Sequence, residues 1–325
     1  MTTIRRIAYV ALALAYAQIV FGAIVRITDS GLGCGTHWPK CNGMWFPPLD
    51  NTELIIEITH RWIAAGLLVA TLALVITAFL RRHEPGVGGR GGVLRMGSAA
   101  AALWLAPAIL GAITVWLELP PLVVVVHMAL ALALLAVLAI AVVRAGGFGA
   151  ARLMSESVAP RAARAAIATA GLTFIVVMMG GFTANVPGAA PACQGFPLCN
   201  GGVIAEGTAQ AIHWTHRLIA FFLAFHVTGL TIAAWKRNNV MMRRAITVLA
   251  ALVATQIVIA AVLVSTFLPP VLQSAHQAVG TLVWLTVVIA AALAWRGSKY
   301  AARVPSDGST RSAAPARTER GALVS

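Results

Sequence analysis

Four histidines stand in apolar segments of this 325-residue chain and are the residues best suited to chemistry. An imidazole nitrogen binds a metal ion or a haem iron through its lone pair. Two such rings that face each other inside a helix bundle fill the two axial positions of one haem iron. The sequence predicts two pairs of this kind, His60 with His127 and His216 with His276.

The segments around these histidines occur twice. Glu57-Ile58-Thr59-His60-Arg61 in the first half of the chain corresponds to His213-Trp214-Thr215-His216-Arg217 in the second. A Leu-Pro-Pro segment ends six residues before His127, and another ends six residues before His276. Because the shared segments follow in the same order, they indicate a duplication.

The composition is typical of a protein that crosses the membrane many times. Hydrophobic residues make up 59% of the chain and charged residues 10%, far from the balance of a soluble domain. A helix needs roughly 20 apolar residues to cross about 30 Å of hydrocarbon. The sequence predicts an all-α membrane protein with eight such helices, at 7–27, 54–80, 96–116, 122–143, 165–184, 209–235, 243–266 and 271–295.

The basic residues gather on one side of the predicted membrane domain. Of the 24 lysines and arginines, 20 lie in alternate connections or near the chain ends. The positive-inside rule therefore predicts a plasma-membrane protein with both termini in the cytoplasm. The loops predicted outside, which contain only Lys40 as a cation, are 28–53, 117–121, 185–208 and 267–270. This pattern explains the net charge of +14, so nucleic acid is not an expected partner.

Each half contains four predicted helices. Because four is an even number, both halves enter the membrane in the same direction, as parallel repeats do. The predicted division is an N-terminal four-helix bundle at 1–143, a cytoplasmic linker at 144–164, a C-terminal four-helix bundle at 165–296 and a disordered basic tail at 297–325.

The four histidines share one depth in the membrane. Counted from the outer ends of their helices, they lie roughly 8 to 10 Å down at 1.5 Å per residue. Ionisable groups in a bilayer are costly and usually functional, which favours haem ligation over ordinary hydrogen-bonded interior histidines. Zinc fits less well, because the apolar helices offer no third and fourth ligand at this depth.

The two halves differ at one position beside the sites. Glu57 stands three residues before His60, and His213 stands three residues before His216. Such residues share a helix face with the ligand, so Glu57 is predicted to face the first haem as a general base or to stabilise positive charge. One half would then react while the other carries electrons. The alternative is a helix N-terminal acid that satisfies the dipole and the free amide groups.

The four cysteines fall in two outer loops, where oxidation is permitted. They are Cys34 and Cys41 in the first half, and Cys193 and Cys199 in the second. Their spacing suits a structural disulfide over each bundle. A redox-active pair that exchanges with an outside thiol is the alternative.

Three arginines near the outer ends of helices are candidates to bind haem propionates. Arg26 ends the first predicted helix, whereas Arg61 and Arg217 directly follow two of the histidines. A guanidinium matches a carboxylate well. Contact with lipid head groups explains these positions nearly as well.

These segments resemble the haem A synthase family over nearly the whole chain, roughly 7–295. The resemblance is carried by the run from Gly22 to Cys34, by Trp38-Pro39-Lys40-Cys41-Asn42-Gly43, and by the histidine-containing segments given above. It implies two four-helix bundles in the membrane. It also implies an oxidoreductase that converts the C8 methyl of haem O to a formyl group, yielding haem A for assembly of the terminal oxidase.

The resemblance also implies roles for individual residues. His60 and His127 would bind the substrate haem O, with Glu57 as the catalytic carboxylate. His216 and His276 would bind a haem b. The disulfides would be Cys34–Cys41 and Cys193–Cys199. A haem O synthase, oxidase assembly factors and membrane lipid are possible partners, and the electron acceptor stays open.

Two other functions remain open at this point. An electron-transfer cytochrome with two permanent haems b would need the same histidine pairs. Electron transfer across the membrane needs haems at two depths, however, and all four histidines are predicted near one face. A transporter or an assembly scaffold would bind no haem.

Overall fold

Eight long α-helices account for most of the residues that the computed structural model describes, which are 1–150, 158–236 and 240–301. Each contains a segment long and apolar enough to cross a membrane. The predicted all-α, multi-pass membrane fold is thus confirmed. In chain order the helices are α1 (Thr2–Ile27), α2 (Thr52–Leu80), α3 (Val93–Trp116), α4 (Pro121–Arg144), α5 (Pro160–Asn185), α6 (Thr208–Trp235), α7 (Val240–Ser265) and α8 (Pro270–Ala301).

Local sequence signals fix where the histidine-containing helices begin. Asn51 precedes α2, and its side-chain oxygen accepts hydrogen bonds from two backbone N–H groups of the first turn, at 2.8 and 3.4 Å. This satisfies donors that have no partner within the helix. Helices α4 and α8 begin at Pro121 and Pro270, because the fixed φ of proline suits the first helical position. The Leu-Pro-Pro segments therefore set the depth of His127 and His276.

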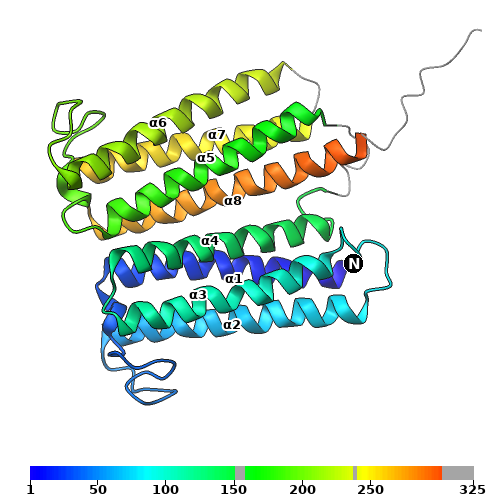
Figure 1. Cartoon of the computed structure of the whole chain (residues 1–325), viewed down its shortest axis with the longest axis horizontal. Coiled ribbons are helices and arrows are strands. Elements are labelled where there is room, and N and C mark those ends of the chain that lie inside the picture. Colours follow the sequence, from blue (N-terminus) through cyan, green and yellow to red (C-terminus); the bar gives the residue numbers. More distant parts are fainter. Residues whose placement is uncertain (151–157, 237–239, 302–325) are drawn as a thin grey trace, which may run out of the picture.

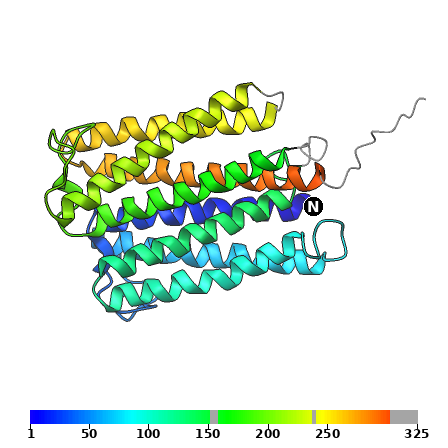
Figure 2. The same cartoon turned by 45° about the horizontal axis from the view of Figure 1, so that its top comes forward.

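The helices form two groups of four, α1–α4 and α5–α8 (Figures 1 and 2). In the first group α1 contacts α2, α2 contacts α3, α3 contacts α4, and α4 closes onto α1. The second group has the same order from α5 to α8. This is the packing that a duplicated bundle would give. The domain division at 1–143 and 165–296 stays a prediction.

Helix α8 joins the two groups, since it packs on α1 and α4 as well as on α5 and α7. The buried indole N–H of Trp284 donates to the Leu132 carbonyl on α4, at 3.0 Å. Its ring also packs against Phe174 on α5, with centroids 5.5 Å apart. The Tyr16 hydroxyl on α1 donates to the Ala278 carbonyl at 3.2 Å. These contacts place both histidine pairs in one framework.

Several predicted helix ends differ from the structure; helix α1, for example, begins at Thr2 and not at 7. Helix α8 continues to Ala301, so 297–301 is helical and does not belong to a disordered tail. Helix α5 already begins at Pro160, within the predicted linker 144–164. The run of apolar residues ends where a helix would leave the hydrocarbon. Backbone hydrogen bonds continue the helix beyond that point. The rest of the linker and tail predictions falls largely on 151–157 and 302–325, outside the described residues.

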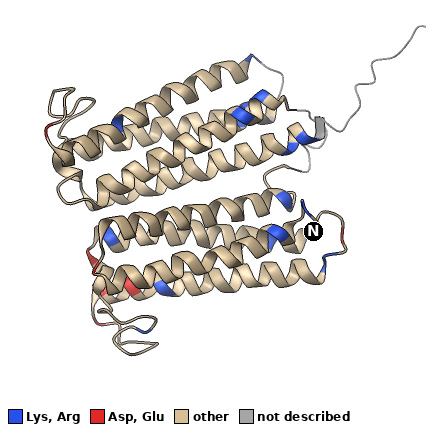
Figure 3. Ribbon diagram, viewed as in Figure 1, with Lys and Arg blue, Asp and Glu red and all other residues tan. Residues whose placement is uncertain are grey.

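Charged residues mark the two ends of the membrane domain (Figure 3). Lysines and arginines gather at the end where the chain begins, and the two long loops between α1 and α2 and between α5 and α6 lie at the other end. The distribution follows the alternation seen in the sequence. Which end faces the cytoplasm stays a prediction.

Candidate functional site

The structure brings together both predicted histidine pairs. His60 on α2 and His127 on α4 lie close enough to interact electrostatically, as do His216 on α6 and His276 on α8. All four residues are half-buried. Each bundle thus places two imidazoles inside the membrane-spanning region.

Glycines allow neighbouring helices to approach these rings. A Cβ atom on Gly22 of α1 would lie 2.9 Å from Cε1 of His60, and one on Gly180 of α5 would lie 3.0 Å from Cε1 of His216. Real Cβ contacts are longer than this, so alanine would push the ring away. The same helix-to-ring contact in both halves holds each imidazole in an equivalent place.

The donor set of each pair fits a haem iron. A haem supplies four nitrogens of its own and needs two axial ligands from the protein. The buried Nδ1 atoms of His60, His127 and His276 have no hydrogen-bond partner, so these rings are not satisfied as ordinary interior histidines are. Over the described ranges, no three His, Cys, Asp or Glu side chains gather as a metal cluster. Two nitrogens per site suit a haem better than a bare zinc ion.

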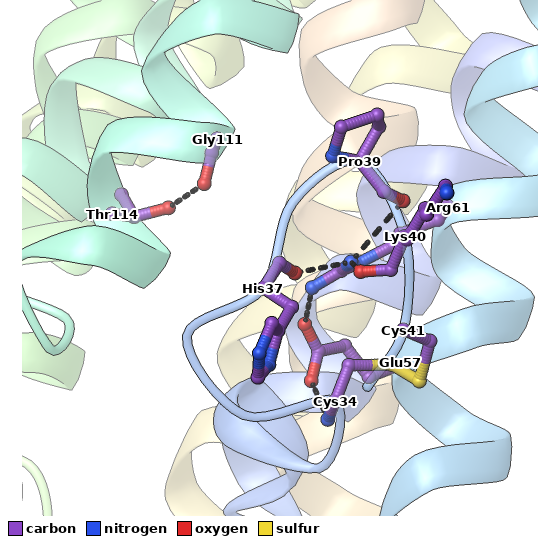
Figure 4. A network of polar contacts seen from close by, with 9 residues as sticks. All are labelled: Cys34, His37, Pro39, Lys40, Cys41, Glu57, Arg61, Gly111 and Thr114. Atoms are coloured by element: carbon purple, nitrogen blue, oxygen red, sulfur yellow. Dashed lines mark hydrogen bonds and ion pairs between the residues drawn. A yellow bond between two sulfur atoms is a disulfide. The ribbon is translucent and has the colours of Figure 1, made fainter. Parts of the chain in front are cut away.

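Glu57 lies at the centre of a polar network near the start of α2 (Figure 4). Its side chain is buried, and one carboxylate oxygen accepts a hydrogen bond from the backbone N–H of Cys34 at 2.7 Å. The other oxygen forms a short ion pair with Arg61, one helical turn away. Arg61 also donates to the carbonyls of His37 and Lys40, at 2.9 Å each. Glu57 therefore connects the histidine-containing helix to the outer loop.

The second half holds its outer loop in a related way. His213 replaces the carboxylate, and its buried Nδ1–H donates to the Ala189 carbonyl at 3.1 Å. Arg217 donates to the carbonyls of Cys193, Gly195 and Leu198, at 2.7 to 2.9 Å. An arginine after the histidine thus binds loop carbonyls in both halves, but a carboxylate is present only in the first.

Both predicted disulfides are confirmed. They link Cys34 to Cys41 and Cys193 to Cys199, and all four cysteines are buried. Each closes the loop that the neighbouring arginine binds. The alternative role of these pairs as redox-active cysteines stays a prediction.

Comparison with known proteins identifies the family. A family model described as cytochrome oxidase assembly protein matches residues 5–288. The haem A synthase of Exiguobacterium sibiricum is 32% identical over 215 residues, which are 64% of this chain and 67% of that protein. The chain belongs to the haem A synthase family. The haem A synthase of Symbiobacterium thermophilum is 29% identical over 225 residues, 67% of this chain and 71% of its own.

A relative with another name matches a shorter segment. The protohaem IX farnesyltransferase of Thermus thermophilus is 45% identical over 73 residues, which are 22% of this chain and 12% of that protein. A segment related to haem A synthases thus occurs within a chain named for a different haem modification.

The predicted arginine contacts with haem propionates stay predictions in this member of the haem A synthase family. Arg61 and Arg217 direct donors to loop carbonyls, and Arg26 donates to the Ala184 carbonyl at 3.2 Å. Their neighbours in the sequence gave no indication of these partners. Sequence reasoning also missed Gln18, although a glutamine inside an apolar helix is a signal of function.

The loop contacts of Arg217 predict a stability effect. Replacing Arg217 with glutamine removes charged donors from three carbonyls and should lower the free energy of unfolding by at least about 2 kcal/mol. Thermal unfolding in detergent measures this. Lys236→Gln is the control, because it removes the same charge from an exposed residue at the other end of α6. It should change the free energy of unfolding by no more than about 0.5 kcal/mol. Equal thermal unfolding midpoints for the two variants would contradict the proposed contribution of Arg217.

Proposed function

We propose that this protein is an oxidoreductase that converts the C8 methyl of haem O to a formyl group, producing haem A for a terminal oxidase. The observation that carries the proposal is the asymmetric duplication in a haem A synthase family member. Each half contains a histidine pair, but only the first places a buried carboxylate, Glu57, one turn before a ligand candidate.

In this proposal the two histidine pairs have different tasks. His60 and His127 bind the substrate haem O, so the first bundle performs the oxidation. His216 and His276 hold a resident haem b. When bound, haem b supplies one-electron redox chemistry and passes electrons toward an acceptor.

The proposed reaction oxidises the methyl carbon twice. In each hydroxylation a C–H bond of the methyl carbon is replaced by a C–O bond to oxygen from water, which releases two protons and two electrons. The second product, a geminal diol, loses water to form the aldehyde. The released electrons pass one at a time to the haem b that His216 and His276 hold. Glu57 is held by Cys34 and Arg61, so its orientation is fixed before reaction. A carboxylate preorganised in an apolar medium stabilises positive charge that develops on the substrate.

The membrane setting supports further parts of the proposal. The basic end of the helices faces the cytoplasm of the cell, by the positive-inside rule, and the disulfide loops face outward. A haem O synthase is the chemically expected supplier of substrate, and oxidase assembly factors are the expected recipients of product. The shared segment in the Thermus farnesyltransferase supports a link between the two modifications.

Haem analysis tests the proposed activity. The protein is expressed in a host that makes haem O but no haem A, and its haems are extracted and separated by chromatography. We expect haem A or its hydroxymethyl precursor together with haem b. A His60→Ala variant is the matched negative control. Recovery of haem b beside unchanged haem O would instead support an electron-transfer cytochrome.

A further inference from the structure

The imidazoles of His60 and His216 occupy equivalent places but make different hydrogen bonds. The Nδ1–H group of His216 donates to the Val176 backbone carbonyl at 3.1 Å. Because Nδ1 carries the proton, Nε2 keeps its lone pair. A ring oriented by such a bond is a well-prepared iron ligand.

The ring of His60 lacks this arrangement. Its Nδ1 is buried without a partner, and its Nε2 lies 3.2 Å from the amide nitrogen of Gln18. In this orientation the Gln18 amide donates to the Nε2 lone pair, and with the amide turned over, its oxygen would accept from Nε2–H. Either orientation occupies the nitrogen whose equivalent in His216 is free to bind iron.

Gln18 and Val176 stand at equivalent positions in the two halves. Gln18 lies four residues before Gly22 on α1, and Val176 lies four residues before Gly180 on α5. Both glycines contact Cε1 of the neighbouring imidazole, so they fix the register between the halves. Among the described residues, the chain therefore places an amide against the candidate ligand nitrogen only in the first half.

The second half has its own intramembrane glutamine, but it binds a different group. Gln256 on α7 donates to the backbone carbonyl of His276 at 2.9 Å and leaves the ring nitrogens alone. Both glutamines have a buried amide oxygen without a partner, but within the described residues only the amide of Gln18 contacts an imidazole nitrogen. A single neutral hydrogen bond contributes only about 0.5–1.5 kcal/mol net, so an iron that binds Nε2 can displace the Gln18 amide.

We propose that Gln18 makes haem binding at His60 reversible, because its amide competes with the iron for Nε2. The first-half haem is then released after reaction, whereas the second-half haem is retained. This rests on the proposed function, in which only the first half exchanges substrate for product. Gln18 is a positioning residue that acts through His60. One neutral hydrogen bond corresponds to a change of about three- to tenfold in binding.

The test exchanges the two residues. Full-length protein carrying haem b is loaded with haem O, and transfer of each haem to excess apomyoglobin is followed by absorbance and by chromatography of the haems. Gln18→Val gives the first half the residue of the second, and Val176→Gln does the reverse. Thr71→Val is the matched control: it removes a buried hydroxyl that bonds only within α2, about 16 Å along the helix from His60.

We expect Gln18→Val to slow haem O release about three- to tenfold while its haem b content stays unchanged, which also shows that the variant folds. Val176→Gln should speed haem b release by a similar factor, and Thr71→Val should change neither rate. Wild-type haem O release in Gln18→Val would overturn the role of Gln18, whatever the result for Val176→Gln. If loaded wild-type protein held no more haem O than His60→Ala does, the haem O site and the proposed function would fail instead.

Discussion

Replacing His216 with alanine is expected to remove haem b while leaving haem O bound in the first half. His60→Ala should have the reverse effect, because each histidine belongs to its own bundle. We expect both variants to lose haem A formation by at least about a hundredfold, the first through loss of the electron path and the second through loss of substrate binding. Haem extraction gives the content of each haem, and reduced-minus-oxidised spectra report haem b directly.

The experiment is decisive because each of the two variants is expected to lose a different haem. A variant that merely misfolds would lose both haems, so retention of the haem in the unaltered half is the internal control. His226→Ala is a second control: this histidine lies on α6 and pairs with Thr169, at 3.0 Å, away from either histidine pair. Loss of the same haem from both ligand variants would contradict the assignment of separate sites.

The sequence predicts the framework of these sites because two strong signals agree. Apolar length defines the helices, and the repeated Leu-Pro-Pro segments place His127 and His276 at equal depth, since the second proline starts each helix. The pairing of histidines across each bundle follows from that register. Hydrophobicity could not locate the end of α8, because its last turns lie beyond the apolar segment.

Contacts that depend on loop folding could not be predicted from spacing. Arg61 and Arg217 adjoin the histidines, and their contact with haem propionates stays a prediction, but spacing gave no sign that their donors reach the carbonyls of the outer loops. The contact between Gln18 and His60 likewise joins residues 42 positions apart. Only the packing of α1 on α2 reveals it.

Glu57→Gln is expected to abolish most haem A formation while haem O stays bound. The proposed chemistry needs a negative charge beside the reacting group, and removing a preorganised charge or an acid–base group costs about a hundredfold or more. Glutamine preserves size and can still accept the hydrogen bond from Cys34. Its amide nitrogen, however, would face the Arg61 guanidinium, so the ion pair is lost as well. Haem chromatography after expression measures both substrate retained and product formed.

The loss of the ion pair means that Glu57→Gln alone cannot separate chemistry from loop anchoring. Arg61→Lys resolves this, because lysine keeps a cation beside the buried Glu57 carboxylate but lacks the guanidinium donors that reach the loop carbonyls. If the carboxylate acts on the substrate, Arg61→Lys should retain product formation within about tenfold of wild type, against the loss of about a hundredfold or more in Glu57→Gln. Equal losses in the two variants would assign Glu57 to holding the disulfide loop over the bundle, and the reacting charge would have to come from another residue.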